Sequence, residues 1–99
     1  MKEITPMNLA TIAADKEVIN QALHQTANFK SSLVSIKAGG ELKPHTSPTD
    51  AFILLLEGEG VFTIEGKPIE LHRHDYFSFK ANQLHSLKAI KDLRMLLVR

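Results

Sequence analysis

The chain has 99 residues, including 12 lysine or arginine residues, 11 aspartate or glutamate residues and no cysteine. This length predicts one domain with a single core, and the balanced, dispersed charge argues against nucleic acid or an anionic membrane as a partner. Without cysteine, disulfides, thiol nucleophiles and thiolate metal sites are excluded.

One periodic segment lies in the N-terminal third of the chain. Residues 15–24 place Val18, Ile19, Ala22 and Leu23 at the spacing of one helix face. The local pattern therefore predicts a helix in this segment.

Residues 33–99 are divided into short apolar runs by turn residues, a pattern typical of an antiparallel barrel or sandwich. The predicted strands cover residues 33–36, 52–57, 61–65, 69–71, 76–79, 85–89 and 93–98. Turns are expected at residues 39–40, 58–60, 65–68 and 91–92. This part of the sequence predicts an all-β fold.

Side chains alternate between the two faces of a strand, and this alternation separates a pocket face from an outer face. If His85 points into a barrel, Leu87 and Ala89 do so too, while Ser86 and Lys88 point outward. By the same rule, the apolar side chains expected to line a pocket are Ile53, Leu55, Phe62, Ile64, Phe77, Phe79 and Leu87.

Two segments together resemble the conserved motifs of the cupin family. Residues 39–60 read GGELKPHTSPTDAFILLLEGEG and follow the first motif, G(x)5HxH(x)3-4E(x)6G, at Gly39, His45 and Gly58. Residues 74–89 read HDYFSFKANQLHSLKA and follow the second motif, G(x)5PxG(x)2H(x)3N, at His85. The resemblance implies a small single-domain cupin of the conserved-barrel type.

Several motif positions carry other residues. In the first motif, Ser47 stands at the second histidine and Ala51 at the glutamate, so two metal ligands are missing. In the second motif the substituted positions are His74, Lys80, Asn82 and Ala89. His74-Asp75 still resembles the Gly-Asp turn common in the family, and asparagine tolerates the positive φ that glycine supplies.

The resemblance also implies an architecture. It predicts a cupin barrel, which is a double-stranded β-helix of jelly-roll type, over residues 1–99 as one domain. Residues 33–99 form the barrel core, and the N-terminal segment 1–32 adds a strand over residues 18–23 in place of the helix. Tertiary pairing can override a helix propensity this weak.

Only His45 and His85 match metal-ligand positions. Two imidazoles rarely hold a divalent ion tightly, so we expect either no cofactor or a weakly bound divalent transition metal. Asp50 is the nearest third donor, but neighbouring strand residues point to opposite faces. Without a metal, the two rings would bind water, a hydroxyl or a carboxylate at a pocket mouth. Counting strand reversals places His72 and His74 at the opposite end of the barrel.

A fold that hosts many chemistries does not choose among functions. We predict a small-molecule-binding protein with a partly lost metal site, whose pocket includes His45, Ser47 and His85 beside the apolar residues above. The alternative is a metal-dependent enzyme, of oxygenase or isomerase type, that uses His45 and His85 with an unusual third ligand. A third interpretation is a dimeric accessory protein with a vestigial pocket.

Both faces of the strand at residues 52–56 are apolar, because Phe52, Leu54 and Leu56 point away from the pocket face. The strand at 93–98 is equally apolar. One face of an antiparallel sheet normally meets water, so this surface requires a second cover. We expect a homodimer to provide it; the alternative is that residues 4–23 fold back over the strand.

The apolar runs also bear on location. The longest, residues 51–56, is far too short to span a bilayer, and residues 1–10 lack the continuous apolar run of a signal peptide. We expect a cytoplasmic protein without a membrane partner.

Overall fold

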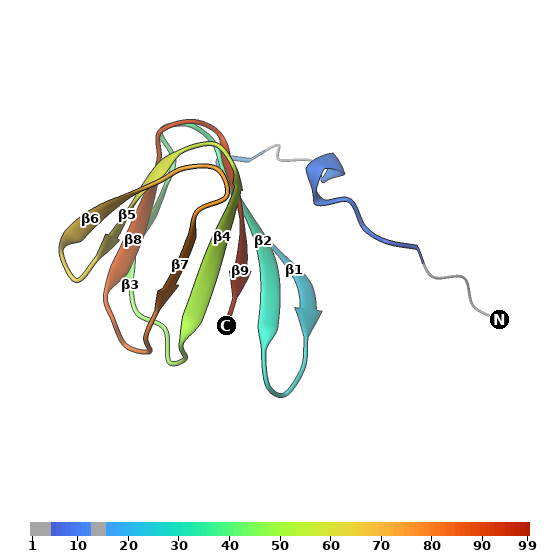
Figure 1. The fold of residues 1–99 in the computed structure, drawn as a ribbon, viewed down its shortest axis with the longest axis horizontal. Helices are drawn as coiled ribbons and strands as arrows, with labels where there is room; N and C mark the ends of the chain where they lie inside the picture. Colours follow the sequence, from blue (N-terminus) through green and yellow to red (C-terminus); the bar gives the residue numbers. More distant parts are fainter. Residues whose placement is uncertain (1–4, 13–15) are drawn as a thin grey trace.

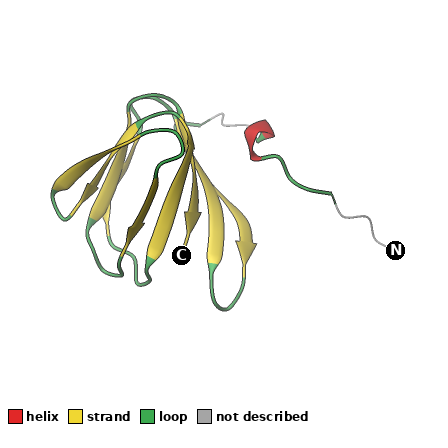
Figure 2. Cartoon of the chain, in the orientation of Figure 1, coloured by secondary structure: helices red, strands yellow, loops and turns green. Residues whose placement is uncertain are grey.

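The computed structural model describes residues 5–12 and 16–99. In this part of the chain a short 3-10 helix is followed by nine strands (Figures 1 and 2). These elements are η1 (Leu9–Thr11), β1 (Val18–Gln25), β2 (Lys30–Ile36), β3 (Glu41–His45), β4 (Ala51–Glu57), β5 (Gly60–Ile64), β6 (Lys67–Leu71), β7 (Tyr76–Phe79), β8 (His85–Ala89) and β9 (Leu93–Val98). No helix in the described ranges is long and apolar enough to cross a membrane.

The strands form two antiparallel sheets that pack face to face. The five-stranded sheet has the order β1-β2-β9-β4-β7, and the four-stranded sheet has the order β3-β8-β5-β6. Strands distant in sequence are therefore neighbours, as in a double-stranded β-helix. The predicted all-β barrel of jelly-roll type is confirmed.

The first strand corrects the local helix prediction. Residues 18–25 form β1, whose ladder along β2 runs from Val18 opposite Ile36 to Gln25 opposite Lys30. The pairing of seven residues outweighs a helical spacing of only four apolar side chains. Residue 15, where the predicted helix began, lies outside the described residues. The strand expected at 18–23 is confirmed.

One strand was not predicted. β3 contains a single strongly apolar residue, Leu42, and also carries Pro44, so it shows no alternation. Proline lacks a backbone N–H and is tolerated on sheet edges, and β3 is an edge strand of the four-stranded sheet. The error matters because β3 ends at His45.

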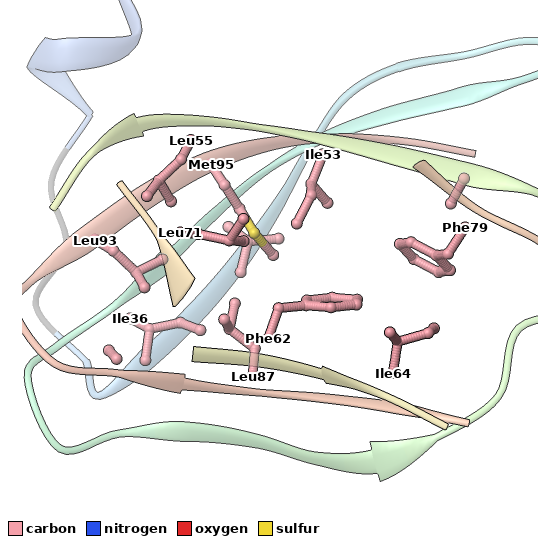
Figure 3. Close-up of a cluster of buried hydrophobic side chains, with 13 residues drawn as sticks. Ile36, Ile53, Leu55, Phe62, Ile64, Leu71, Phe79, Leu87, Leu93 and Met95 are labelled. Carbon is pink, nitrogen blue, oxygen red and sulfur yellow. The ribbon is translucent and has the colours of Figure 1, made fainter. Parts of the chain in front are cut away.

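Apolar side chains from both inner faces fill the space between the sheets. Val34 of β2, Ile53 of β4, Phe62 of β5, Leu87 of β8 and Met95 of β9 are nearly inaccessible to solvent, as alternation requires. Figure 3 shows how this core runs along the barrel. Leu55 and Leu93 lie toward one end of it, and Phe79 and Ile64 lie toward the other.

The two ends of the barrel differ. At the mouth end, which is the lower end in Figure 1, β3, β7 and β9 finish and β4 and β8 begin. At the closed end lie the β4–β5, β6–β7 and β8–β9 turns. His45 and His85 are therefore brought to the mouth end, whereas His72 and His74 follow β6 to the closed end, as predicted.

Non-glycine residues take the left-handed conformation at two motif glycine positions. His74 has φ of 76° and Asn82 has φ of 67°. The His74 turn is held by the Asp75 carboxylate, whose Oδ2 accepts a hydrogen bond of 2.7 Å from the His72 N–H. The backbone geometry of the motif is thus retained where its glycines are not, as expected for His74-Asp75 and Asn82.

The outer face of the five-stranded sheet is apolar and only half-buried. It carries Phe52, Leu54, Leu56, Leu96 and Val98. The η1 segment contacts this face at β9, where the Arg94 guanidinium donates hydrogen bonds to the Leu9 and Ile12 carbonyls, and residues 18–23 pair with β2 instead of crossing the face. The described hydrogen bonds between the N-terminal segment and this face are thus made at Arg94, while Phe52, Leu54 and Leu56 are half-buried.

Candidate functional site

His45 and His85 lie side by side at the mouth end. They are directly opposite one another in the ladder between β3 and β8, and such partners place their side chains on one face of the sheet. The ring centroids are 4.3 Å apart, with an edge-to-face angle of 64°. His85 is 7% exposed, whereas His45 is open to solvent. One imidazole is thus inside the barrel and the other is at its rim.

Backbone carbonyls fix the orientation of both rings. The Nδ1 atom of His45 lies 2.7 Å from the Lys43 carbonyl, and that of His85 lies 2.8 Å from the Gln83 carbonyl. A carbonyl only accepts, so Nδ1 carries the proton in each neutral ring and Nε2 keeps its lone pair. Each ring therefore presents one acceptor nitrogen, the arrangement that also orients metal-binding histidines.

Burial lowers the pKa of His85 below its ordinary value of 6.5, because a desolvated site disfavours the imidazolium. The hydrogen bond to the Gln83 carbonyl raises this pKa, and the charge of His45 lowers it further. The net direction is downward, so His85 is neutral at neutral pH and its Nε2 accepts hydrogen bonds.

The lowered pKa predicts a pH dependence of folding stability. Between pH 6.5 and the lower pKa of His85 in the folded state, the unfolded chain binds more protons than the folded chain. The stability that the protein gains from neutral His85 is therefore complete above pH 6.5 and is lost as the pH falls through that window. An NMR titration should show His85 titrating below 6.5, and His45→Gln should move its pKa upward. A His85 pKa above 6.5 would contradict the desolvated placement.

A cavity of about 40 Å³ lies beside the two rings. Six predicted pocket residues line it: His45, Ile53, Phe62, Phe79, His85 and Leu87. The sequence analysis missed its other lining residues, which are Leu42, Ser86, Met95 and Leu97. Leu42 was missed with its strand, and alternation along β9 would have found Met95 and Leu97. The cavity has room for a water molecule or an ion but not for an organic ligand.

The remaining predicted pocket residues lie elsewhere. Ile64 and Phe77 line a larger open cleft of about 630 Å³ at the mouth end, which also reaches Phe79. Leu55 is fully buried toward the closed end (Figure 3). Ser47 is 6% exposed and is not among the residues that line the cavity or the cleft.

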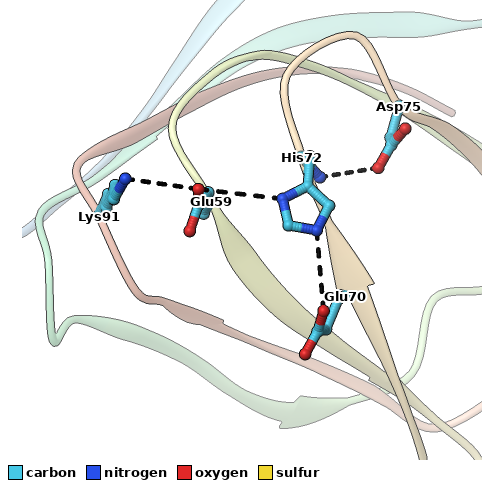
Figure 4. Close-up of polar contacts among 5 residues, drawn as sticks. All are labelled: Glu59, Glu70, His72, Asp75 and Lys91. Atoms are coloured by element: carbon cyan, nitrogen blue, oxygen red, sulfur yellow. Dashed lines mark hydrogen bonds and ion pairs between the residues drawn. The ribbon is translucent and has the colours of Figure 1, made fainter.

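A cluster of polar side chains around His72 lies at the closed end (Figure 4). His72 lies between two carboxylates, with Nδ1 4.0 Å from Glu59 and Nε2 3.7 Å from Glu70, and Lys91 lies 3.4 Å from Glu59. More than half of the His72 side chain is exposed, so these pairs contribute little to stability. The cluster lies in an exposed turn at the end of the barrel that was predicted for His72.

Comparison with known proteins identifies the family. The family model Cupin_2, described as "Cupin domain", matches residues 32–99. The chain belongs to the cupin family. No protein with a curated description matches its sequence.

Several solved structures have the same fold over nearly the whole chain. A cupin superfamily protein from Desulfitobacterium hafniense DCB-2 is 26% identical, with a TM-score of 0.86 over 99% of this chain and 92% of that one. An RmlC-like cupin from Desulfovibrio desulfuricans is 27% identical, with a TM-score of 0.85 over 97% and 95%. A Streptococcus pyogenes protein of unknown function is 23% identical, with a TM-score of 0.86 over 99% and 88%.

The cupin metal site is incomplete in this chain. Within residues 5–12 and 16–99, no group of three or more histidine, cysteine, aspartate or glutamate side chains is placed to hold a metal ion. Asp50, the third donor considered from sequence, is turned elsewhere, since its Oδ1 accepts a 2.8 Å hydrogen bond from the Ala81 N–H. The donor set does not fit a tightly held ion.

The two substituted ligand positions of this cupin are buried. Ser47, at the second histidine, has a buried Oγ without a hydrogen-bond partner among the described residues. Ala51, at the glutamate, is 7% exposed and shares the inner face of β4 with Ile53 and Leu55. Burying a hydroxyl without a hydrogen-bond partner costs about 1–3 kcal/mol of folding free energy. Serine is therefore not the residue that would give the most stable fold at position 47.

Proposed function

We propose that this cupin binds a small molecule at the mouth end of the barrel, with His45 and His85 as hydrogen-bonding groups in place of a complete metal centre. One observation carries the proposal. The two rings lie 4.3 Å apart, both Nδ1 atoms are bonded to backbone carbonyls, and no third donor joins them in the described part of the chain.

The chemistry of the pair defines what the ligand must offer. Neutral His85 presents an acceptor nitrogen, so the complementary group is a hydroxyl or an N–H. The 40 Å³ cavity admits a group of that size and excludes a ring. The ligand therefore reaches the pair with one small polar group and keeps its body outside the cavity.

A fragment screen by ligand-observed NMR tests this proposal. We expect hits to be enriched in fragments that carry a hydroxyl or N–H, and their affinity to fall at least about 5-fold in His85→Phe, because one buried hydrogen bond is lost. His24→Gln is the matched control, since His24 is an exposed histidine of β1. Hits that bind wild type and His85→Phe equally would contradict the proposal.

The metal-dependent enzyme of oxygenase or isomerase type remains the second candidate. The observation that favours it is the Nδ1 hydrogen bonding of both rings, which leaves each Nε2 available to an ion. This candidate requires a third ligand from water, from the substrate or from outside the described residues. The number of metal ions per chain in the purified protein separates the two candidates.

We also propose that two copies of the chain associate through the outer face of the five-stranded sheet. Phe52, Leu54 and Leu96 give this face an apolar centre, and its Arg94 is paired with Glu57 at 3.4 Å and donates hydrogen bonds to the Leu9 and Ile12 carbonyls. An apolar sheet face with its charge compensated suits packing against an identical face.

Light scattering tests this association. The expected mass is twice 11.0 kDa, and it should fall to the monomer value in Leu54→Asp, because a buried unpaired carboxylate is costly. Glu70→Asp, an exposed position of β6, is the control. A wild-type mass of 11.0 kDa would reject the dimer.

A further inference from the structure

The open cleft of about 630 Å³ lies around the free edge of β7 at the mouth end. β7 pairs only with β4, so its other edge has no strand partner in the described sheets. The cleft meets both faces of β7, and Ile64 of β5 lines it from the other sheet. Its volume lies within the range of small-molecule sites, in contrast to the 40 Å³ cavity.

Aromatic rings form much of the cleft wall. Phe52 and Tyr76 pack with centroids 5.3 Å apart on the outer face, and Phe77 and Phe79 stack at 6.4 Å on the inner face. Tyr76 is 61% exposed, so its ring is accessible to a partner on the outer face. Such a surface favours a flat apolar molecule, above all an aromatic ring.

The polar groups at the cleft favour an anion. Lys80 and Arg99 line it, and neither belongs to an ion pair formed within the described residues. The one acidic lining residue, Asp50, uses Oδ1 to accept from the Ala81 N–H. Gln83 accepts from the Lys80 N–H through Oε1, which leaves its amide NH₂ as a further donor.

One side chain separates the cleft from the cavity beside the histidine pair and contacts both. Phe79 lines both the cleft and the cavity, and its ring centroid lies 4.5 Å from that of His85. A ligand that occupies the cleft therefore packs against the residue that also packs against His85.

We propose that this cleft binds an aromatic carboxylate, with the ring against Phe77 and Phe79 on the inner face of β7 and the carboxylate at Lys80 and the Gln83 amide. The inference names the ligand class for the same barrel mouth and so rests on the proposed function. It adds residues that are not among the metal-ligand positions of the cupin motifs.

Titration of ¹⁵N-labelled protein with benzoate tests the inference. We expect saturable shifts of the β7 amides, with affinity reduced about 5-fold for benzyl alcohol and for Lys80→Gln, because a charge-assisted contact at a partly exposed site is lost. Phe77→Leu should lower the affinity for benzoate by a similar factor, because the contact between the two rings is lost. Lys88→Gln, an exposed lysine of β8 that does not line the cleft, should bind as wild type does.

The outcomes separate this inference from the proposed function. Benzoate binding that survives Lys80→Gln but is lost in His85→Phe overturns the cleft site and supports a ligand held by the histidines. Absence of saturable benzoate shifts, with His85-dependent fragments still found, overturns only the ligand class. If benzoate binds with full dependence on Lys80 while no fragment depends on His85, the cleft site stands and the histidine proposal fails.

Discussion

Ser47→His should convert the incomplete site into a metal centre, raising the affinity for Zn²⁺ or Ni²⁺ on the order of 100-fold. Ser47 occupies the second-histidine position of the motif, is buried, and has an Oγ without a described partner. A histidine there would join His45 and His85 as a third imidazole, the count that catalytic zinc sites use. Competition against a chromophoric chelator measures the change.

Thr46→His is the matched control for this gain in metal affinity. Thr46 is adjacent in the same loop but exposed, whereas Ser47 is buried. The expected result is little change in Thr46→His and loss of the gained affinity in the Ser47→His/His85→Ala double variant. An equal gain from both single substitutions would mean that the ion binds at the surface.

Gly58→Ala should destabilise the fold by about 3 kcal/mol, lowering the melting temperature by about 15 °C for a domain of this size. Gly58 has φ of 88°, and a Cβ there would lie 2.1 Å from the Asp92 carbonyl oxygen. Backbone strain and this collision act together. Urea unfolding measures the loss of free energy.

Gly66→Ala separates the two causes. Gly66 has φ of 80°, but a Cβ added there would have no other atom within 4 Å. Only the conformational cost applies, and it is about 1 kcal/mol. Equal destabilisation by the two substitutions would contradict the close approach of the β4–β5 turn to Asp92.

The sequence predicted the elements whose pattern is local. β7, β8 and β9 have the predicted bounds, because each is a short alternating or apolar run between turn residues. β1 could not be assigned from its own residues, because its conformation is set by pairing with β2. β3 was missed because an edge strand with one apolar side chain carries no periodic signal.

The candidate site could also be predicted only in part. His45 and His85 could be paired from motif positions, and alternation on β4, β5 and β8 gave the cavity residues Ile53, Phe62 and Leu87. The cleft could not be derived in this way. It depends on the free edge of β7 and on the approach of Lys80 and Arg99, which are set by the packing of two sheets and not by a strand pattern.

Metal analysis of protein purified without chelator tests the central claim most directly. Two imidazoles without a third described donor predict clearly less than one ion per chain. Zinc, iron, nickel or copper at one ion per chain, lost in His85→Ala, would contradict the account and establish this cupin as a metal-dependent protein.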